Sequence, residues 1–297
     1  MAYELKMFYS PVHELLLSMS LYKRQTQMKY LTLGATWPQE VEERISSSLQ
    51  ERIASNTTLN FEDLSVLLMA QCPIEDDIDG LFDWLQSKSS GELYELLSPF
   101  LKSSLPPDLE AQRDRFISLL KEWRAEYFDK IDTTILEDLK SDAIEKSELL
   151  KTSTPAEIVH KASRFVITND NIQTVYLMPG FHFYPMSLID QFQNTVFITY
   201  PVHSKKNEQK ELLRITKALS DERRLNILTF LSSGIYTFTN IVSEIGMAKG
   251  NIHHHLSILR AAGLLNIHIT DDPNTFYYST NRSFTSDLTS KLNNLLN

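Results

Sequence analysis

The chain has 297 residues, of which 42% are hydrophobic and 23% charged, with 8 glycines and 11 prolines. This composition can bury a core and excludes collagen-like, low-complexity and wholly disordered chains. The single cysteine, Cys72, excludes a disulfide framework and any metal site that needs two thiolates. Residues 1–25 lack the pattern of a secretory leader, and no run approaches the roughly 18 apolar residues of a membrane span. The sequence therefore predicts a cytoplasmic protein without a membrane partner.

The net charge of −9 is unevenly distributed along the chain. Residues 205–297 contain 11 Lys and Arg against 8 Asp and Glu, a net charge of +3, which leaves −12 on residues 1–204. Such asymmetry suggests two modules with different partners. The polar stretch 201–209 separates them. We therefore expect an N-terminal regulatory or interaction domain at 1–204 and a second domain at 205–297.

The N-terminal domain is predicted to be mostly helical, with a few short strands. An alternating strand at 3–9 leads into Ser10 and Pro11, which are typical of a helix cap and first turn. A second helix is expected from Pro38 to Ile53, where apolar residues recur every fourth position. Further helices are expected at 61–69, 74–85, 92–101 and 108–130. Short β-rich segments at 164–168, 173–178 and 195–200 predict a small antiparallel sheet, joined by the N-terminal strand. The predicted class is α+β.

Residues 211–280 have the pattern of a helix-turn-helix followed by a wing. A helix at about 239–245 ends at Gly246, because a left-handed helix end favours a residue without Cβ. The next helix begins near Lys249 and runs to Gly263, and two helices joined by such a turn form a helix-turn-helix. Alternating segments at 264–270 and 275–280 flank a turn that begins at Asp271, which predicts a β-hairpin.

These elements resemble the ArsR-type (ArsR/SmtB-like) winged-helix transcription regulators. The resemblance rests on KALSDERRLNIL, then IVSEIGMAKGNIHHHLSILRAAGLL, then the hairpin ending in FYYST, within about residues 210–282. It implies a dimeric, sequence-specific DNA-binding repressor that is not an enzyme. No phosphate-cradling glycine loop, His-Glu-x-x-His run or nucleophile elbow occurs in residues 1–204, in agreement with that expectation.

The second helix of the motif is expected to present a DNA-reading face. When Ile252 faces inward, short polar side chains fall on the opposite side near the helix start, where a recognition helix enters the major groove. Asn251 can pair with an adenine edge, although a capping role is the alternative, and basic side chains suit phosphates. His255 is expected to pack toward the core. The predicted DNA contacts are Lys249, Gly250, Asn251, His253, His254, Ser257, Arg260, Arg224 and Arg282.

Metal sensing is not expected, and no cofactor is predicted. Three consecutive histidines leave a helix about 100° apart, so they cannot converge on one ion. The resemblance implies ligand positions that here read Thr237-Phe238-Thr239 instead of a cysteine pair. Ala248 replaces the usual capping Ser or Thr. Asp271 and Asp272 at the wing tip predict that the wing stands clear of DNA.

The last helix contains an apolar stripe, which the resemblance assigns to dimerisation. Its members are Phe284, Leu288, Leu292 and Leu295. Packing of this stripe on the protein's own N-terminal region is the alternative. The aromatic segment 176–184 suggests either core packing or a pocket for an unknown small-molecule effector. An alternative function is a winged helix used as a protein-protein interaction module in an assembly factor, which the acidic wing tip favours.

Overall fold

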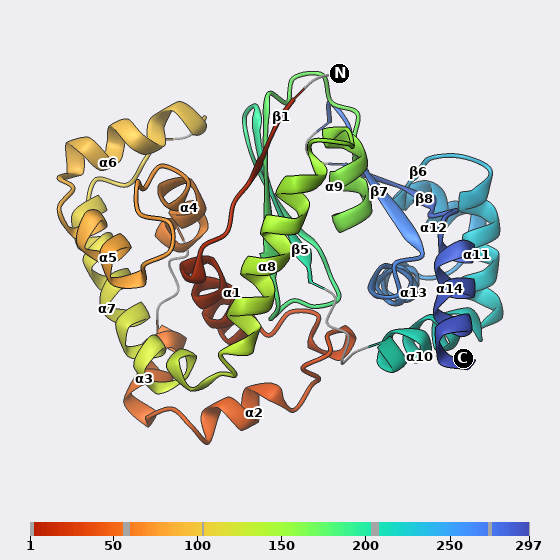
Figure 1. Ribbon diagram of the computed structural model, residues 1–297, viewed down its shortest axis with the longest axis horizontal. Coiled ribbons are helices and arrows are strands. Elements are labelled where there is room, and N and C mark those ends of the chain that lie inside the picture. The colour runs from red at the N-terminus through yellow and green to blue at the C-terminus, as the bar shows by residue number, and fades with distance from the viewer. Residues whose placement is uncertain (1–2, 56–59, 103, 203–207, 273–274, 297) are drawn as a thin grey trace.

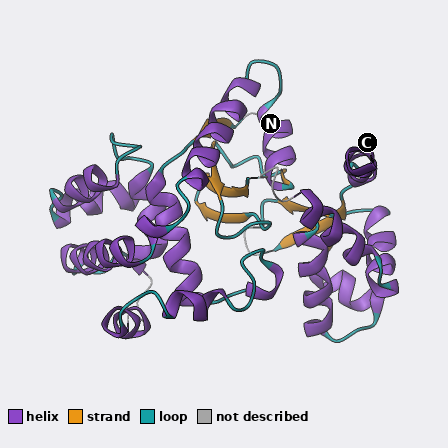
Figure 2. Ribbon diagram, turned by 60° about the horizontal axis from the view of Figure 1, so that its bottom comes forward, coloured by secondary structure: helices purple, strands orange, loops and turns teal. Residues whose placement is uncertain are grey.

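The computed structural model describes residues 3–55, 60–102, 104–202, 208–272 and 275–296. A group of N-terminal helices lies on one side of a central sheet, and the C-terminal helices lie on the other side (Figure 1). The strands run between these two helical parts (Figure 2). This arrangement confirms the predicted α+β class. None of the described helices is both long and apolar enough to cross a membrane.

The central sheet is mixed, which corrects the antiparallel prediction. Its strand order is β1 (Glu4–Met7), β3 (Thr174–Gly180), β5 (Thr195–Pro201) and β4 (Leu188–Phe192). The first three are parallel, and only β4 pairs with β5 in the antiparallel direction. The reason is the path of the chain. Strand β4 lies at the edge of the sheet, and β5 then returns between β4 and β3. The N-terminal strand joins this sheet as predicted.

Helices α1 to α7 form the larger part of the N-terminal core. Ser10 caps α1, since its Oγ accepts a hydrogen bond from the Val12 amide at 3.3 Å. Fully buried Phe82 and Trp123 pack in one cluster with Met178 and Phe197 of the sheet. The bounds are α1 (Pro11–Arg24), α2 (Trp37–Glu42), α3 (Ser47–Ser55), α4 (Asn60–Met69), α5 (Ile78–Gln86), α6 (Ser90–Leu97) and α7 (Leu109–Glu126), with short 3-10 helices η1 (Met28–Tyr30), η2 (Ser98–Phe100) and η3 (Phe128–Lys130).

The helix predicted from Pro38 to Ile53 is interrupted, so it forms α2 and α3 instead. The break lies at Ser46, whose Oγ accepts a hydrogen bond from the Leu49 amide at 3.2 Å and donates to Glu126 of α7 at 3.0 Å. The apolar residues still face the core, because Val41 and Leu49 are both buried. A cap within a periodic pattern therefore divides one predicted helix into two.

Two helices that the sequence pattern did not predict cover the other face of the central sheet. They are α8 (Thr134–Leu149), which crosses in front of the strands in Figure 1, and α9 (Pro155–Ser163). A capping box starts α9, in which Thr154 and Glu157 each accept a hydrogen bond from the other's backbone amide. The left-handed residue Arg164 ends α9 and leads directly into the next strand.

That strand, β2 (Phe165–Ile167), was predicted in the central sheet. It belongs instead to the sheet of the C-terminal wing. It pairs in parallel with β7 (Leu265–Ile269) in a sheet of order β2-β7-β8-β6. The buried side chains of Ile267 and Ile269 share a cluster with N-terminal Val175. Both hydrogen bonding and apolar burial therefore join the two halves. The predicted boundary at 204/205 lies outside the described residues.

Candidate nucleic-acid interface

The C-terminal part is a winged helix-turn-helix, as predicted. Its core contains the fully buried residues Ile227, Ile241, Ile252 and Leu259. The hairpin β7–β8 forms the wing, and β6 adds to it. The remaining bounds are α10 (Glu208–Leu219), α11 (Glu222–Ser232), β6 (Tyr236–Thr237), α12 (Phe238–Ile245), α13 (Lys249–Ala261), β8 (Phe276–Thr280) and α14 (Phe284–Leu296).

The turn between α12 and α13 fixes the start of the recognition helix. Gly246 has φ of 70°, and its amide donates to the Val242 carbonyl at 3.0 Å to close α12. Thr237 and Asn240 form a capping box at the start of α12. By contrast, Ala248 at the start of α13 makes no side-chain capping bond. The first amides of α13 are therefore not capped by the Ala248 side chain, and they supply the positive pole of a helix to an approaching phosphate.

The first turn of α13 forms an exposed polar surface. Lys249, Gly250, Asn251 and His253 are all exposed. A Cβ at Gly250 would meet no atom within 4 Å, so the backbone at this point is open to close approach by a ligand. Short polar side chains around an open backbone match the groove-facing end of a recognition helix.

His254 is exposed, but it is hydrogen-bonded to the N-terminal part of the chain. Its Nδ1 lies 2.7 Å from the Tyr30 Oη, and the two ring centroids are 5.7 Å apart. Partial burial, together with the nearby Lys29 ammonium, lowers the pKa of His254. The sequence did not predict this contact, because 224 residues separate the partners.

Ser257 and Arg260 are turned inward, which corrects their prediction as DNA contacts. Ser257 is only 3% exposed. It lies between His254 and Ala261 on one face of the helix, and Ala261 packs in the N-terminal core. The N-terminal part therefore covers this face. The Arg260 Nε is buried in the same region and lines a cavity between the two halves.

Two further arginines that were predicted to contact DNA donate hydrogen bonds to backbone carbonyls of the protein itself. The Arg224 guanidinium donates to the carbonyls of Ala218 and Lys217 at 2.6 and 2.8 Å, which closes the end of α10. Arg282 is exposed, and it donates to the Ser232 carbonyl at 2.9 Å at the end of α11. Arg223, which is not among the predicted DNA contacts, is exposed at the start of α11. Its neighbour Arg224 is the more buried of the two, which helical periodicity could have indicated.

The residues considered for metal binding have other roles. Thr237 caps α12, and His255 is buried with its Nδ1 3.9 Å from Asp221. Within the described ranges, no group of three or more His, Cys, Asp or Glu side chains is arranged to hold a metal ion. The wing-tip residues Asp271 and Asp272 are exposed.

The apolar stripe of α14 divides into two halves. Phe284 and Leu288 are partly buried against the winged-helix core. Leu292 and Leu295 are 38% and 50% exposed, and Leu213 on the adjacent α10 is 52% exposed. The second half of the stripe is therefore left largely uncovered by the described residues, whereas the first half packs on its own module.

Comparisons with known proteins match this part of the chain. The model of the family described as "Bacterial regulatory protein, arsR family" matches residues 221–266. The transcriptional repressor SdpR of Bacillus subtilis is 32% identical over 83 residues, which cover 28% of this chain and 90% of SdpR. The chain belongs to the ArsR family of bacterial regulatory proteins. It is thus a DNA-binding transcription regulator with a winged helix-turn-helix.

Solved structures of other regulators are similar to the same portion. HlyU from Vibrio cholerae is 25% identical, with a TM-score of 0.25, and the match covers 31% of this chain and 97% of HlyU. NolR from Sinorhizobium fredii is also 25% identical with a TM-score of 0.25, and here the match covers 32% of this chain and 94% of NolR.

Proposed function

We propose that the chain is a dimeric, sequence-specific repressor whose α13 reads DNA bases through its first turn. The observation that carries this proposal is the exposed surface of Lys249, Gly250, Asn251 and His253 beside an open helix start. Asn251 can pair with an adenine edge, and His253 can donate to or accept from several base edges. Lys249 is placed for a phosphate, and exposed Arg223 takes the phosphate role first expected of Arg224.

A homodimer places two recognition helices one DNA turn, about 34 Å, apart. The exposed leucines of α10 and α14 supply the apolar surface that such a dimer buries. Residues 205–297 form the DNA-binding module, and residues 1–204 form a regulatory module that responds to a small-molecule effector. No metal acts at the positions that metal sensors of the family use, since Thr237 serves as a cap. The protein acts in the cytoplasm and performs no catalysis.

Titration of the full chain against the DNA upstream of its own gene tests this function. The titration is repeated at several salt concentrations and with excess unrelated competitor DNA. We expect binding that survives the competitor and weakens with salt at a log–log slope near −0.9 per neutralised phosphate. Binding that the competitor abolishes would contradict sequence-specific recognition. It would favour the use of the winged helix in protein contacts.

A further inference from the structure

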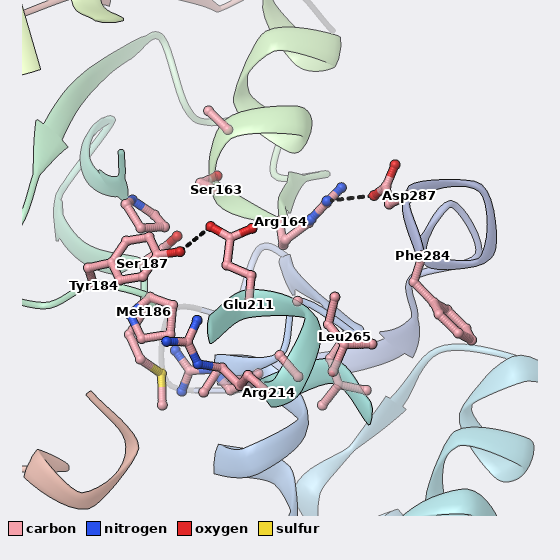
Figure 3. Close-up of a pocket in the computed structure, with 18 of the residues that line it drawn as sticks. Ser163, Arg164, Tyr184, Met186, Ser187, Glu211, Arg214, Leu265, Phe284 and Asp287 are labelled. Carbon is pink, nitrogen blue, oxygen red and sulfur yellow. Dashed lines mark hydrogen bonds and ion pairs between the residues drawn. The ribbon is translucent and has the colours of Figure 1, made fainter. Parts of the chain in front are cut away.

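A cavity of about 100 Å³ lies where the two halves of the chain meet. Its walls come from the end of α9, the loop before β4, the strand β7, and helices α10, α13 and α14 (Figure 3). Its size corresponds to roughly three water molecules, so it suits a small molecule or ion. Small residues at the end of α13 leave this space open, namely Ala261, Ala262 and Gly263.

The charge around this cavity is positive. Five basic side chains line it against two carboxylates, Glu211 and Asp287. Each carboxylate is already paired, since Asp287 lies 3.1 Å from the Arg164 guanidinium and Glu211 lies 2.6 Å from the Lys291 ammonium. Glu211 also accepts a hydrogen bond from the Tyr184 hydroxyl. Figure 3 shows the Arg164–Asp287 and Tyr184–Glu211 interactions at different sides of the cavity.

These ion pairs involve Arg164 and Lys291, whereas Lys161 is exposed and Arg260 lies with its Nε buried. This Nε has no hydrogen-bond partner among the described residues. The nearby Tyr278 phenol is neutral near pH 7, because burial raises its pKa. Burial lowers the pKa of Arg260, but a guanidinium remains protonated in a folded protein. A buried guanidinium N–H without a hydrogen-bond partner is unfavourable unless an acceptor, such as an anion, reaches it.

The apolar side chains that line the rest of the cavity indicate which chemical class of anion would fit it. Apolar side chains of Met186, Ile215, Leu265 and Phe284 face the same cavity. Arg214 is engaged elsewhere, because it donates to the Thr32 hydroxyl at 2.6 Å and lies over the Tyr184 ring. One planar guanidinium amid apolar walls is suited to a carboxylate on a short hydrocarbon body.

We propose that this cavity binds a short-chain carboxylate, whose carboxyl group pairs with Arg260 and whose hydrocarbon part contacts the apolar wall. The bound ligand touches both modules, since Tyr184 and Met186 precede the predicted boundary and Arg260 belongs to the recognition helix. Its binding therefore favours one arrangement of α13 relative to the N-terminal module. This regulatory consequence rests on the proposed DNA-binding function, whereas the site itself does not.

Thermal unfolding of the full chain without DNA tests the site independently of DNA binding. Sodium butyrate, sodium phosphate and sodium chloride are compared at matched ionic strength. We expect butyrate to raise the Tm above the chloride value, because a ligand that binds only the native state stabilises it. The absence of any such rise would overturn the proposal. A rise with phosphate alone would overturn the assignment to carboxylates.

Two variants locate the ligand. Arg260→Met removes the charge, and Ala262→Leu fills the space while keeping Arg260. Both are expected to weaken butyrate binding roughly tenfold or more in a calorimetric titration. Arg115→Met, which replaces an exposed arginine on α7, is the control and should bind as the parent does. If Arg260→Met does not fold, Ala262→Leu decides the outcome. Undiminished butyrate binding by a folded cavity variant would place the ligand elsewhere and contradict the proposal.

Discussion

At the scale of single residues, the exposure of each side chain decides which predicted contacts remain available for DNA. Helical periodicity placed Asn251 outward and Ile252 inward, and both positions agree with the structure. The same periodicity could not show that Ser257 is covered, because the covering segment around Tyr30 is more than 200 residues away in sequence. Nor could it show that Arg224 closes the end of α10. These features depend on tertiary packing.

His13 gives a prediction about stability and pH. Its buried ring lies with Nε2 2.9 Å from the Thr199 hydroxyl, and burial lowers its pKa to about 4 although neighbouring Glu14 opposes this. Between pH 6.5 and 4 the unfolded chain therefore binds a proton that the folded chain does not. The contribution of His13 to the free energy of unfolding is therefore fully present above pH 6.5. It falls by about 3 kcal/mol as the pH drops from 6.5 toward 4.

Urea unfolding at pH 7 and pH 4.5 measures this effect. Between pH 7 and pH 4.5, we expect the free energy of unfolding of the parent to fall by about 2 kcal/mol more than that of His13→Gln. The reason is that glutamine does not titrate. Contributions from the other histidines are present in both proteins, so they cancel in the comparison. An equal loss in the two proteins would show that His13 does not titrate in this way.

At the scale of elements, caps and chain path account for most differences from the sequence prediction. The periodic pattern of residues 38–53 predicts one helix, but a cap at Ser46 divides it into two. Three β-rich segments were predicted correctly as strands, yet β2 pairs with the wing, since a strand's composition does not identify its partner. The helix-turn-helix was predictable because Gly246, the capped helices and the hairpin are local features.

The exposed half of α14 predicts a dimer interface. We expect the double variant Leu292→Glu, Leu295→Glu to be monomeric at concentrations where the parent is dimeric, because it places four carboxylates in the shared apolar surface. Sedimentation equilibrium measures the molar mass. Ile144→Glu is the control, since it changes a 58% exposed residue on α8 and should leave the dimer intact. A dimeric double variant would place the interface elsewhere.

At the scale of the whole molecule, the shared sheet predicts that the two modules unfold as one cooperative unit. The backbone amide of Ile267 donates to Arg164, and the amide of Thr168 donates to Ile269, at 3.0 and 2.8 Å. Charge and composition predicted two modules with different surfaces. They could not predict this connection, because parallel pairing across about 100 residues leaves no local pattern.

Unfolding followed by two probes tests this cooperativity. All three tryptophans, Trp37, Trp84 and Trp123, lie in the N-terminal module, so tryptophan fluorescence reports on that module alone. Far-ultraviolet circular dichroism reports on the helices of both modules. We expect the two unfolding curves to coincide within error. A dichroism transition that continues after the fluorescence change is complete would show that the winged helix unfolds independently.

The most direct test of base reading by α13 is the affinity of a recognition-helix variant for a DNA site selected by the parent from a random pool. Asn251→Ala, His253→Ala is compared with Asn226→Ala, which changes an exposed asparagine on α11. We predict that the double variant loses about 1–3 kcal/mol of specific binding, roughly 10- to 100-fold in Kd, while its binding to unrelated DNA and the affinity of Asn226→Ala are unchanged. A double variant that binds the selected site as tightly as the parent would contradict base reading by α13.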